Sequence, residues 1–151
     1  MKVQKPARLN RLYRFMELSS VPRVLVVEDV LLVAMDIELT LRGAGYEVVG
    51  PVGRLRPAVE LASAAAIDCA LLDLDLRGAL STPVAYALRR RGIPFAFVTG
   101  DAHSGMLPAD LLDRPVLAKP LSEQRYLATV TQLLAEQHDR SAGNSGAAAR
   151  R

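Results

Sequence analysis

Two hydrophobic patterns alternate along the chain. Short continuous apolar runs predict buried β-strands, and apolar residues recurring every three or four positions predict amphipathic helices. The predicted strands span residues 23–28, 46–50, 68–73, 93–99 and 116–118. Continuous apolar strands separated by such helices are typical of a parallel sheet that is covered on both faces. The pattern therefore predicts an α/β fold with a doubly wound five-stranded parallel sheet.

Capping and stop residues place the helices between these strands. The first helix carries a stripe that includes Val30, Ile37 and Leu41, and it stops at Gly43 and Gly45. The other predicted helices span residues 55–66 and 82–91 and a last segment that begins after Ser122. Pro83 follows Thr82 at a position that favours helix initiation.

Composition divides the chain into three parts. Residues 1–22 form a basic leader, which is possibly helical, and residues 23–137 form the folded domain. Residues 138–151 are rich in Ser, Gly and Ala without apolar periodicity, which predicts a disordered tail. We expect no second folded domain after residue 137. The leader is either an inert segment, a basic amphipathic helix for a membrane or a partner, or the product of a misplaced start codon.

The net charge of +3 comes from the two ends of the chain. Residues 1–22 carry five Lys or Arg and one Glu, whereas residues 23–137 carry eleven Lys or Arg and fourteen Asp or Glu. A mildly acidic central domain argues against nucleic-acid binding in cis. No apolar run approaches the roughly 20 residues of a membrane span, and Cys69 is the only cysteine. We therefore expect a cytoplasmic protein.

Polar side chains follow the predicted strands at their carboxyl ends. The acidic pair Glu28 and Asp29 ends the first strand, and Asp73 ends the third. Thr99 ends the fourth strand and Lys119 the fifth. In open α/β sheets the ligand site lies at these ends, so the five side chains are expected in one crevice.

Three clustered carboxylates favour a hard divalent cation, because without one they repel each other. Mg²⁺ prefers oxygen ligands and keeps several waters, so it suits a site that a phosphate completes. Thr99 is suited to bond a phosphoryl oxygen, and Lys119 to neutralise another. Asp73 is the best-placed nucleophile for an aspartyl phosphate.

In this order, these motifs resemble the receiver domain of bacterial two-component response regulators. The resemblance covers roughly residues 22–137 and rests on Glu28-Asp29, on Leu71-Leu72-Asp73 with Gly78 five residues on, on Thr99-Gly100 and on Lys119-Pro120.

The resemblance implies a flavodoxin-like (βα)₅ fold with strand order 2-1-3-4-5. It also implies Asp73 as phosphoacceptor, helped by Thr99 and Lys119. Mg²⁺ would be held by Glu28, Asp29, Asp73 and the backbone carbonyl of Asp75, and the Lys119–Pro120 bond would be cis.

The segment 94–100, Pro-Phe-Ala-Phe-Val-Thr-Gly, resembles a subgroup of single-domain receivers with a Pro-Phe-x-Phe-x-Thr-Gly signature. The position of the family's switch aromatic holds Val116, so the usual threonine–aromatic coupling cannot operate. Gly105, Pro108 and Pro115 leave little room for a regular fourth helix. We expect a short or mobile segment there, whose ordering on phosphorylation could be the output.

The expected function is that of a stand-alone response regulator. A histidine kinase or phosphotransfer protein would phosphorylate Asp73, and the chain would act through contacts with an unknown downstream protein or as a phosphate sink. It would not be a turnover enzyme. One alternative is a receiver-like interaction domain without phosphorylation. The other is a haloacid-dehalogenase-type phosphatase, suggested by Asp73-Leu-Asp75, although that motif normally ends the first strand.

Three side-chain roles stay open at this stage. Leu31, Leu32 and Met35 fall outside the main stripe of the first helix. They either add core contacts or form a docking patch for a kinase or phosphotransfer helix. The side chains of Asp75 and Asp101 are either bystanders or modulators of phosphoryl hydrolysis.

Overall fold

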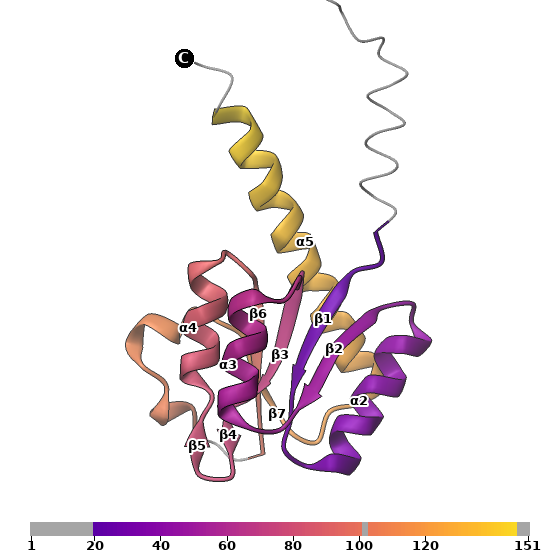
Figure 1. Cartoon of the computed structure of the whole chain (residues 1–151), viewed down its shortest axis with the longest axis vertical. Helices are drawn as coiled ribbons and strands as arrows, with labels where there is room; N and C mark the ends of the chain where they lie inside the picture. Colours follow the sequence, from indigo (N-terminus) through magenta and orange to yellow (C-terminus); the bar gives the residue numbers. More distant parts are fainter. Residues whose placement is uncertain (1–19, 101–102, 148–151) are drawn as a thin grey trace, which may run out of the picture.

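The computed structural model describes residues 20–100 and 103–147, of which 103–104 and 141–147 are described only as backbone. The leader prediction for residues 1–22 lies almost wholly outside this part. A central sheet forms the middle layer of the domain, and helices lie on both of its faces (Figure 1). The main-sheet strands are β1 (Arg23–Val27), β2 (Glu47–Val52), β3 (Cys69–Asp73), β6 (Phe95–Thr99) and β7 (Val116–Ala118).

All neighbouring strands of this sheet are parallel, in the order β2-β1-β3-β6-β7. This order confirms the predicted 2-1-3-4-5 arrangement of a doubly wound sheet. β1 and β3 are central, so the residues that follow them lie next to each other at the carboxyl edge of the sheet. That edge is where the sequence predicted a ligand site.

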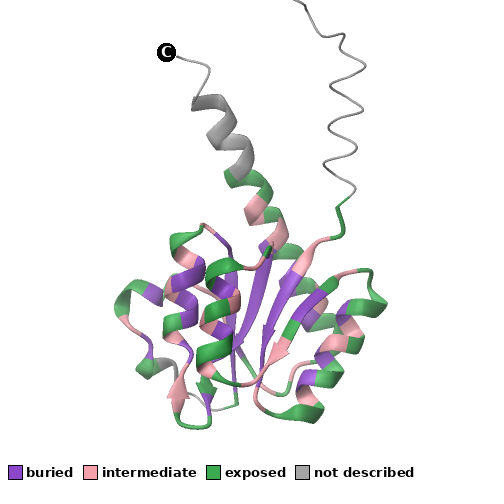
Figure 2. Ribbon diagram, viewed as in Figure 1, coloured by how far each residue is buried: buried purple, intermediate pink, exposed green. Residues whose placement is uncertain are grey.

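Alternate residues of each strand face opposite layers. Leu25 and Val27 pack with helices α3 (Leu55–Ala64) and α4 (Thr82–Arg90). Val24 and Val26 pack on the other face, with helices α2 (Leu31–Gly43) and α5 (Glu123–Ala147). Figure 2 shows the strands buried between these two helical layers. The continuous apolar runs are explained by this double coverage.

Several element boundaries differ from the predictions by one or more residues. β2 continues beyond residue 50 through the cis Gly50–Pro51 bond, where the φ of 91° and the close Val26 carbonyl leave room only for glycine. α3 ends at Ala64 rather than at residue 66. α5 continues to Ala147, past the predicted start of the tail at residue 138, and Arg140 pairs with Glu136 one turn earlier.

The segment between β6 and β7 has no regular α-helix in its described part. Two short 3-10 turns, η1 (His103–Met106) and η2 (Ala109–Leu111), replace it. Tyr86 and Arg89 of α4 hold this segment through Asp110 and Asp113. The prediction of a short segment in this place is therefore confirmed for residues 103–115. The Lys119–Pro120 bond is cis, as predicted.

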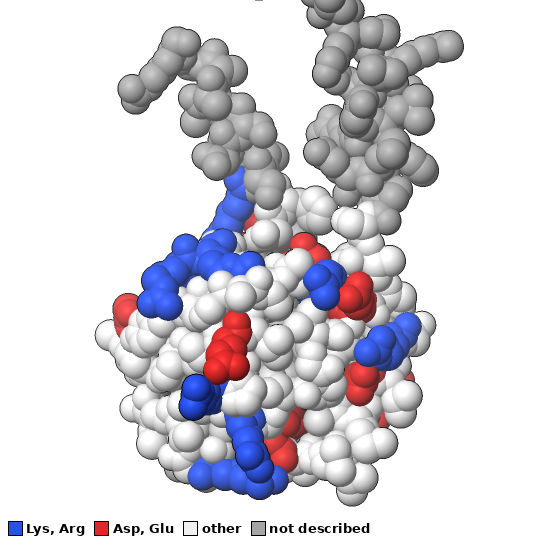
Figure 3. Space-filling view, in the orientation of Figure 1, with Lys and Arg blue, Asp and Glu red and all other residues white. Residues whose placement is uncertain are grey.

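Charged side chains of both signs are mixed over much of the face in Figure 3, with a group of basic side chains at upper left. Two basic residues at the end of α4 have partners within the fold. Arg89 pairs with Asp113, and Arg91 donates to the backbone carbonyls of Ala62 and Ala65. These charges tie α4 to its neighbours. Within the described residues, no helix is both long and apolar enough to cross a membrane.

Cys69 gives a first test of the core. The side chain is fully buried in β3, and burial, helped by nearby Asp68, raises the pKa of its thiol to about 12. Only the thiolate reacts with electrophiles. We expect native protein to resist a thiol reagent at pH 8 for hours, while protein unfolded in denaturant labels at once. Rapid stoichiometric labelling of native protein would contradict the described packing of β3.

Candidate functional site

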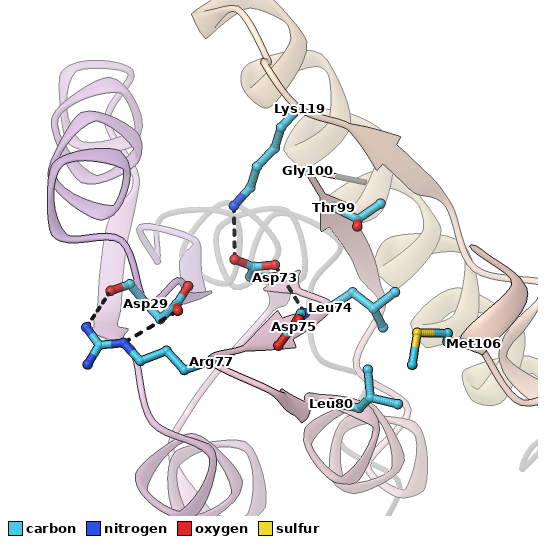
Figure 4. Close-up of a pocket in the computed structure, with 10 residues that line it drawn as sticks. All are labelled: Asp29, Asp73, Leu74, Asp75, Arg77, Leu80, Thr99, Gly100, Met106 and Lys119. Carbon is cyan, nitrogen blue, oxygen red and sulfur yellow. Dashed lines mark hydrogen bonds and ion pairs between the residues drawn. The ribbon is translucent and has the colours of Figure 1, made fainter. Parts of the chain in front are cut away.

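The carboxyl edge of the sheet carries a pocket of about 340 Å³. It is lined by residues that end or follow β1, β3, β6 and β7, together with the β3–α4 connection and one residue of η1. These are Asp29, Asp73, Leu74, Asp75, Arg77, Leu80, Thr99, Gly100, Met106 and Lys119 (Figure 4). Four of the five side chains predicted to meet in one crevice therefore line the pocket, and the fifth, Glu28, bonds to Lys119.

Lys119 joins two buried carboxylates. Its Nζ lies 2.6 Å from Glu28 Oε2 and 2.9 Å from Asp73 Oδ2. The Glu28 side chain is 2% exposed and that of Asp73 is 8% exposed. Because neither carboxylate is hydrated well, the ammonium group provides much of the compensation for their burial.

The local backbone holds the acidic pair in place. The second carboxylate oxygen of Glu28, Oε1, accepts a bond from the Val30 backbone N–H just before α2 begins. The Glu28 N–H donates to the Val52 carbonyl. Gly53 follows, and a Cβ there would meet the Asp29 Cα at 3.0 Å. Glycine thus lets the β2–α3 loop lie directly against the acidic pair.

Asp73 lies at the end of β3, next to the charged side chains of Lys119 and Glu28. Its Oδ1 accepts a bond from the Asp75 backbone N–H at 3.2 Å. Burial raises the pKa of Asp73 from 3.8 to about 6, the hydrogen bond from Lys119 opposes this rise, and the nearby charge of Glu28 adds to it. Burial lowers the pKa of Lys119, but its hydrogen bonds to Glu28 and Asp73 outweigh this and raise the pKa overall. These interactions therefore favour a charged Lys119 ammonium group that both carboxylates, Glu28 and Asp73, contact.

The acidic cluster fits a divalent cation. Carboxylate oxygens of Glu28, Asp29 and Asp73 lie within 4.8 Å of one another. Oxygen donors at such separations are those that Mg²⁺ prefers, and the open pocket beside them has room for its water ligands. The predicted metal-binding side chains are thus together, and Asp75 lies two residues after Asp73.

Thr99 and Asp75 have different places in the pocket. Thr99 is buried at the end of β6, and its side chain lies beside those of Asp73 and Lys119 (Figure 4). The Asp75 side chain makes a local contact within the turn that follows it, where its Oδ1 accepts a hydrogen bond from the Gly78 N–H at 2.6 Å. This contact is a structural role for Asp75 that the sequence did not suggest. Asp101 lies outside the described residues.

Arg77 is a pocket residue that the sequence analysis missed. It lies in the tight turn between two short strands, β4 (Asp75–Leu76) and β5 (Ala79–Leu80), and its Nε lies 3.6 Å from Asp29 Oδ2. Two residues separate Leu76 from Ala79, which is the length of a hairpin loop. That spacing, combined with Gly78, was the available signal.

The fold and this site together define a class, that of receiver domains. No family model matches the chain. Over 59 residues it is 42% identical to the transcriptional regulatory protein PdtaR of Mycobacterium tuberculosis, a match that spans 38% of this chain and 29% of that protein.

Solved structures extend the likeness to the whole domain. SdrG from Sphingomonas melonis Fr1 is 38% identical with a TM-score of 0.64, and the match covers 79% of this chain and 98% of that one. A response regulator receiver protein from Sinorhizobium medicae WSM419 is 27% identical with a TM-score of 0.67, covering 78% and 98%. The chain belongs to the response regulator receiver family.

Proposed function

We propose that this chain is a phosphorylation switch in which Asp73 accepts a phosphoryl group from a histidine kinase or phosphotransfer protein, with Mg²⁺ at the acidic cluster. One observation carries the proposal. Lys119 bridges Glu28 and Asp73 in the same pocket that Asp29 and Thr99 line. A nucleophile, an oxygen-rich cation site and an ammonium group are the parts that phosphoryl transfer needs.

The residues divide the chemistry among them. An Asp73 carboxylate oxygen attacks the phosphorus in line, the new O–P bond forms, and the bond to the donor nitrogen breaks. When bound, Mg²⁺ would neutralise charge on the phosphoryl oxygens. It would be held by Glu28, Asp29, Asp73 and the Asp75 carbonyl. Lys119 then faces one phosphoryl oxygen, and the Thr99 hydroxyl donates to another.

The pocket also supports a route for output. Met106 of η1 lines the pocket, so a phosphoryl group on Asp73 would lie near the segment that replaces a fourth helix. Val116 is aliphatic and packs partly buried against the core, so an aromatic switch is not available at that position. We infer that rearrangement around 103–111 carries the signal to a downstream protein. This pattern also supports the single-domain subgroup with the signature at 94–100.

The alternatives fit this site less well. A receiver-like domain without phosphorylation would not need a nucleophile, a cation cluster and a lysine to meet in one pocket. The phosphatase alternative places its Asp-x-Asp motif at the end of the first strand, whereas Asp73 and Asp75 follow the third strand along the chain. We therefore propose a signalling role, either as an output regulator or as a phosphate sink. The chain would act in the cytoplasm and would not turn over a separate substrate.

The proposal is tested by phosphoryl labelling. Purified protein is incubated with acetyl phosphate, with and without Mg²⁺, and then with each histidine kinase of the source organism. We expect the mass of one phosphoryl group on Asp73, only with Mg²⁺, and fast transfer from one or a few kinases. A protein that binds Mg²⁺ and stays unlabelled by every donor would contradict the proposal.

A docking face for the phosphodonor lies on α2. The side chains of Leu31, Leu32 and Leu39 are 71%, 77% and 69% exposed, and Met35 is 48% exposed. A groove of about 510 Å³ joins this face to the site, since Leu32 and Lys119 both line it. The sequence had left Leu31, Leu32 and Met35 open between core and docking roles, and their exposure favours docking.

We expect Leu31→Asp to slow transfer from the cognate kinase at least tenfold, as for the loss of an interface anchor. Labelling by acetyl phosphate should not change, because this small donor needs no docking face. Unfolding free energy should change by less than about 0.5 kcal/mol, as is usual for exposed positions. The matched control is Leu112→Asp, which charges a leucine that is 59% exposed in the turn after η2. Equal effects of the two variants would argue against docking on α2.

A further inference from the structure

The tight turn at the mouth of the pocket holds an arginine in an unusual backbone conformation. Arg77 and Gly78 are the two central residues between β4 and β5, and their φ angles are 55° and 90°. Turns with positive φ at both positions favour Asn, Asp or Gly. Arg77 is the only described residue other than glycine with positive φ. Such outliers often mark functional positions.

The Arg77 guanidinium lies on the one carboxylate of the cluster that Lys119 does not bond. Its Nε is 3.6 Å from Asp29 Oδ2, and its Nη2 donates to the Asp29 carbonyl at 3.4 Å. Lys119 bonds Glu28 and Asp73. The two cations thus divide the three acidic side chains between them, and Figure 4 shows Arg77 and Lys119 reaching in from different sides.

The contact is one that can be released easily. The Arg77 side chain is 76% exposed, while that of Asp29 is only 13% exposed. Ion pairs as exposed and as long as this one contribute little to stability. Lys119, in contrast, is 19% exposed and makes two short bonds. Arg77 is therefore the cation that can leave the cluster at little cost when a metal ion enters.

We propose that Arg77 is a positioning residue that gates the metal site, an inference that rests on the proposed function above. In the metal-free protein its guanidinium holds the Asp29 carboxylate and competes with Mg²⁺ for it. When Mg²⁺ takes Asp29, the displaced guanidinium remains at the mouth of the pocket, where it faces the anionic phosphoryl donor. Arg77 thus weakens metal binding and strengthens donor binding.

The test is the Mg²⁺ dissociation constant of Arg77→Gln, measured by isothermal titration calorimetry on the whole chain. Removing a unit positive charge beside a divalent ion should lower this constant about threefold to tenfold at low ionic strength. The gain should shrink in about 0.5 M salt, where screening is strong. Arg77→Lys, which keeps the charge, should stay close to the wild type.

The matched control is Arg56→Gln. Arg56 is 92% exposed on α3 and pairs with Glu60, so this variant makes the same change in net charge on a different element. Arg77→Gly keeps the turn with a residue that accepts positive φ, and it should tighten Mg²⁺ binding as Arg77→Gln does. The half-saturating concentration of acetyl phosphate at saturating Mg²⁺ should rise severalfold in the two variants that remove the charge, Arg77→Gln and Arg77→Gly.

Two outcomes separate this inference from the proposed function. If the wild type binds Mg²⁺ and is labelled, but Arg77→Gln binds Mg²⁺ no more tightly than Arg56→Gln, the gate is wrong and the switch stands. If the wild type binds no Mg²⁺, the proposed function is wrong and the gate falls with it.

Discussion

We expect Asp73→Asn to abolish phosphoryl labelling by acetyl phosphate and by any histidine kinase. The amide nitrogen and oxygen that replace the carboxylate cannot form a stable acyl phosphate, so no slower reaction remains at this position. Intact-protein mass spectrometry after incubation with donor and Mg²⁺ measures the loss. Asp75→Asn is the matched control, because its amide oxygen can still accept the bond from Gly78 and labelling should persist. Undiminished labelling of Asp73→Asn would show that another residue is the acceptor.

The same variant changes the pH dependence of stability. In the metal-free protein, burial raises the pKa of Asp73 from 3.8 to about 6. The folded state therefore binds this proton more tightly than the unfolded state does. The stability that protonated Asp73 contributes is present below pH 4 and is lost as the pH rises through about 6. We expect the wild type to lose on the order of 1–3 kcal/mol more than Asp73→Asn between pH 4 and pH 7.5.

Lys119→Gln has the second large effect, on stability as well as on phosphoryl transfer. It leaves Glu28 and Asp73 buried next to each other without the ammonium group that both contact. Removing one partner of a buried ion pair costs about 3–5 kcal/mol. Denaturant unfolding without metal should show a loss of about 3 kcal/mol at pH 8 and a smaller loss at pH 5. At the lower pH, protonation of Asp73 relieves the repulsion.

Two additions make this result specific. Mg²⁺ should restore part of the stability that Lys119→Gln loses, because the ion takes over the role of the missing charge at the carboxylates. Phosphoryl labelling should nevertheless stay at least 100-fold slower than in the wild type, as expected when a charge-stabilising group is removed. Lys119→Arg keeps the charge and is the control for stability. Equal stability of wild type and Lys119→Gln at pH 8 would contradict the buried bridge.

The sequence predicted the sheet and the site because both depend on repeated, simple rules. The run Val24–Val27 is apolar throughout because α3 and α2 lie on its two faces. The carboxyl ends of parallel strands share one edge, so Asp73, Thr99 and Lys119 could be brought together without any coordinates. The strand order itself came from the resemblance to receiver domains, not from the hydrophobic pattern.

Other features depend on contacts that no local pattern records. Lys119 and Glu28 are 91 positions apart in the sequence, so their contact depends on the whole sheet. The position of Arg77 depends on a turn in which this residue has a positive φ, a conformation that arginine rarely adopts. The role of Gly53 depends on the Asp29 backbone that lies beside it. Exposure of Leu31 and Leu32 likewise depends on which side of α2 the core occupies.

The most direct test of the account is a crystal structure with Mg²⁺ and beryllofluoride, an analogue of the phosphoryl group. We predict that beryllium bonds to an Asp73 carboxylate oxygen and that Lys119 and Thr99 contact its fluorine atoms. The metal ion should contact the acidic cluster and the Asp75 carbonyl. A structure in which beryllium avoids Asp73, or in which the ion binds away from Asp29 and Asp73, would contradict it.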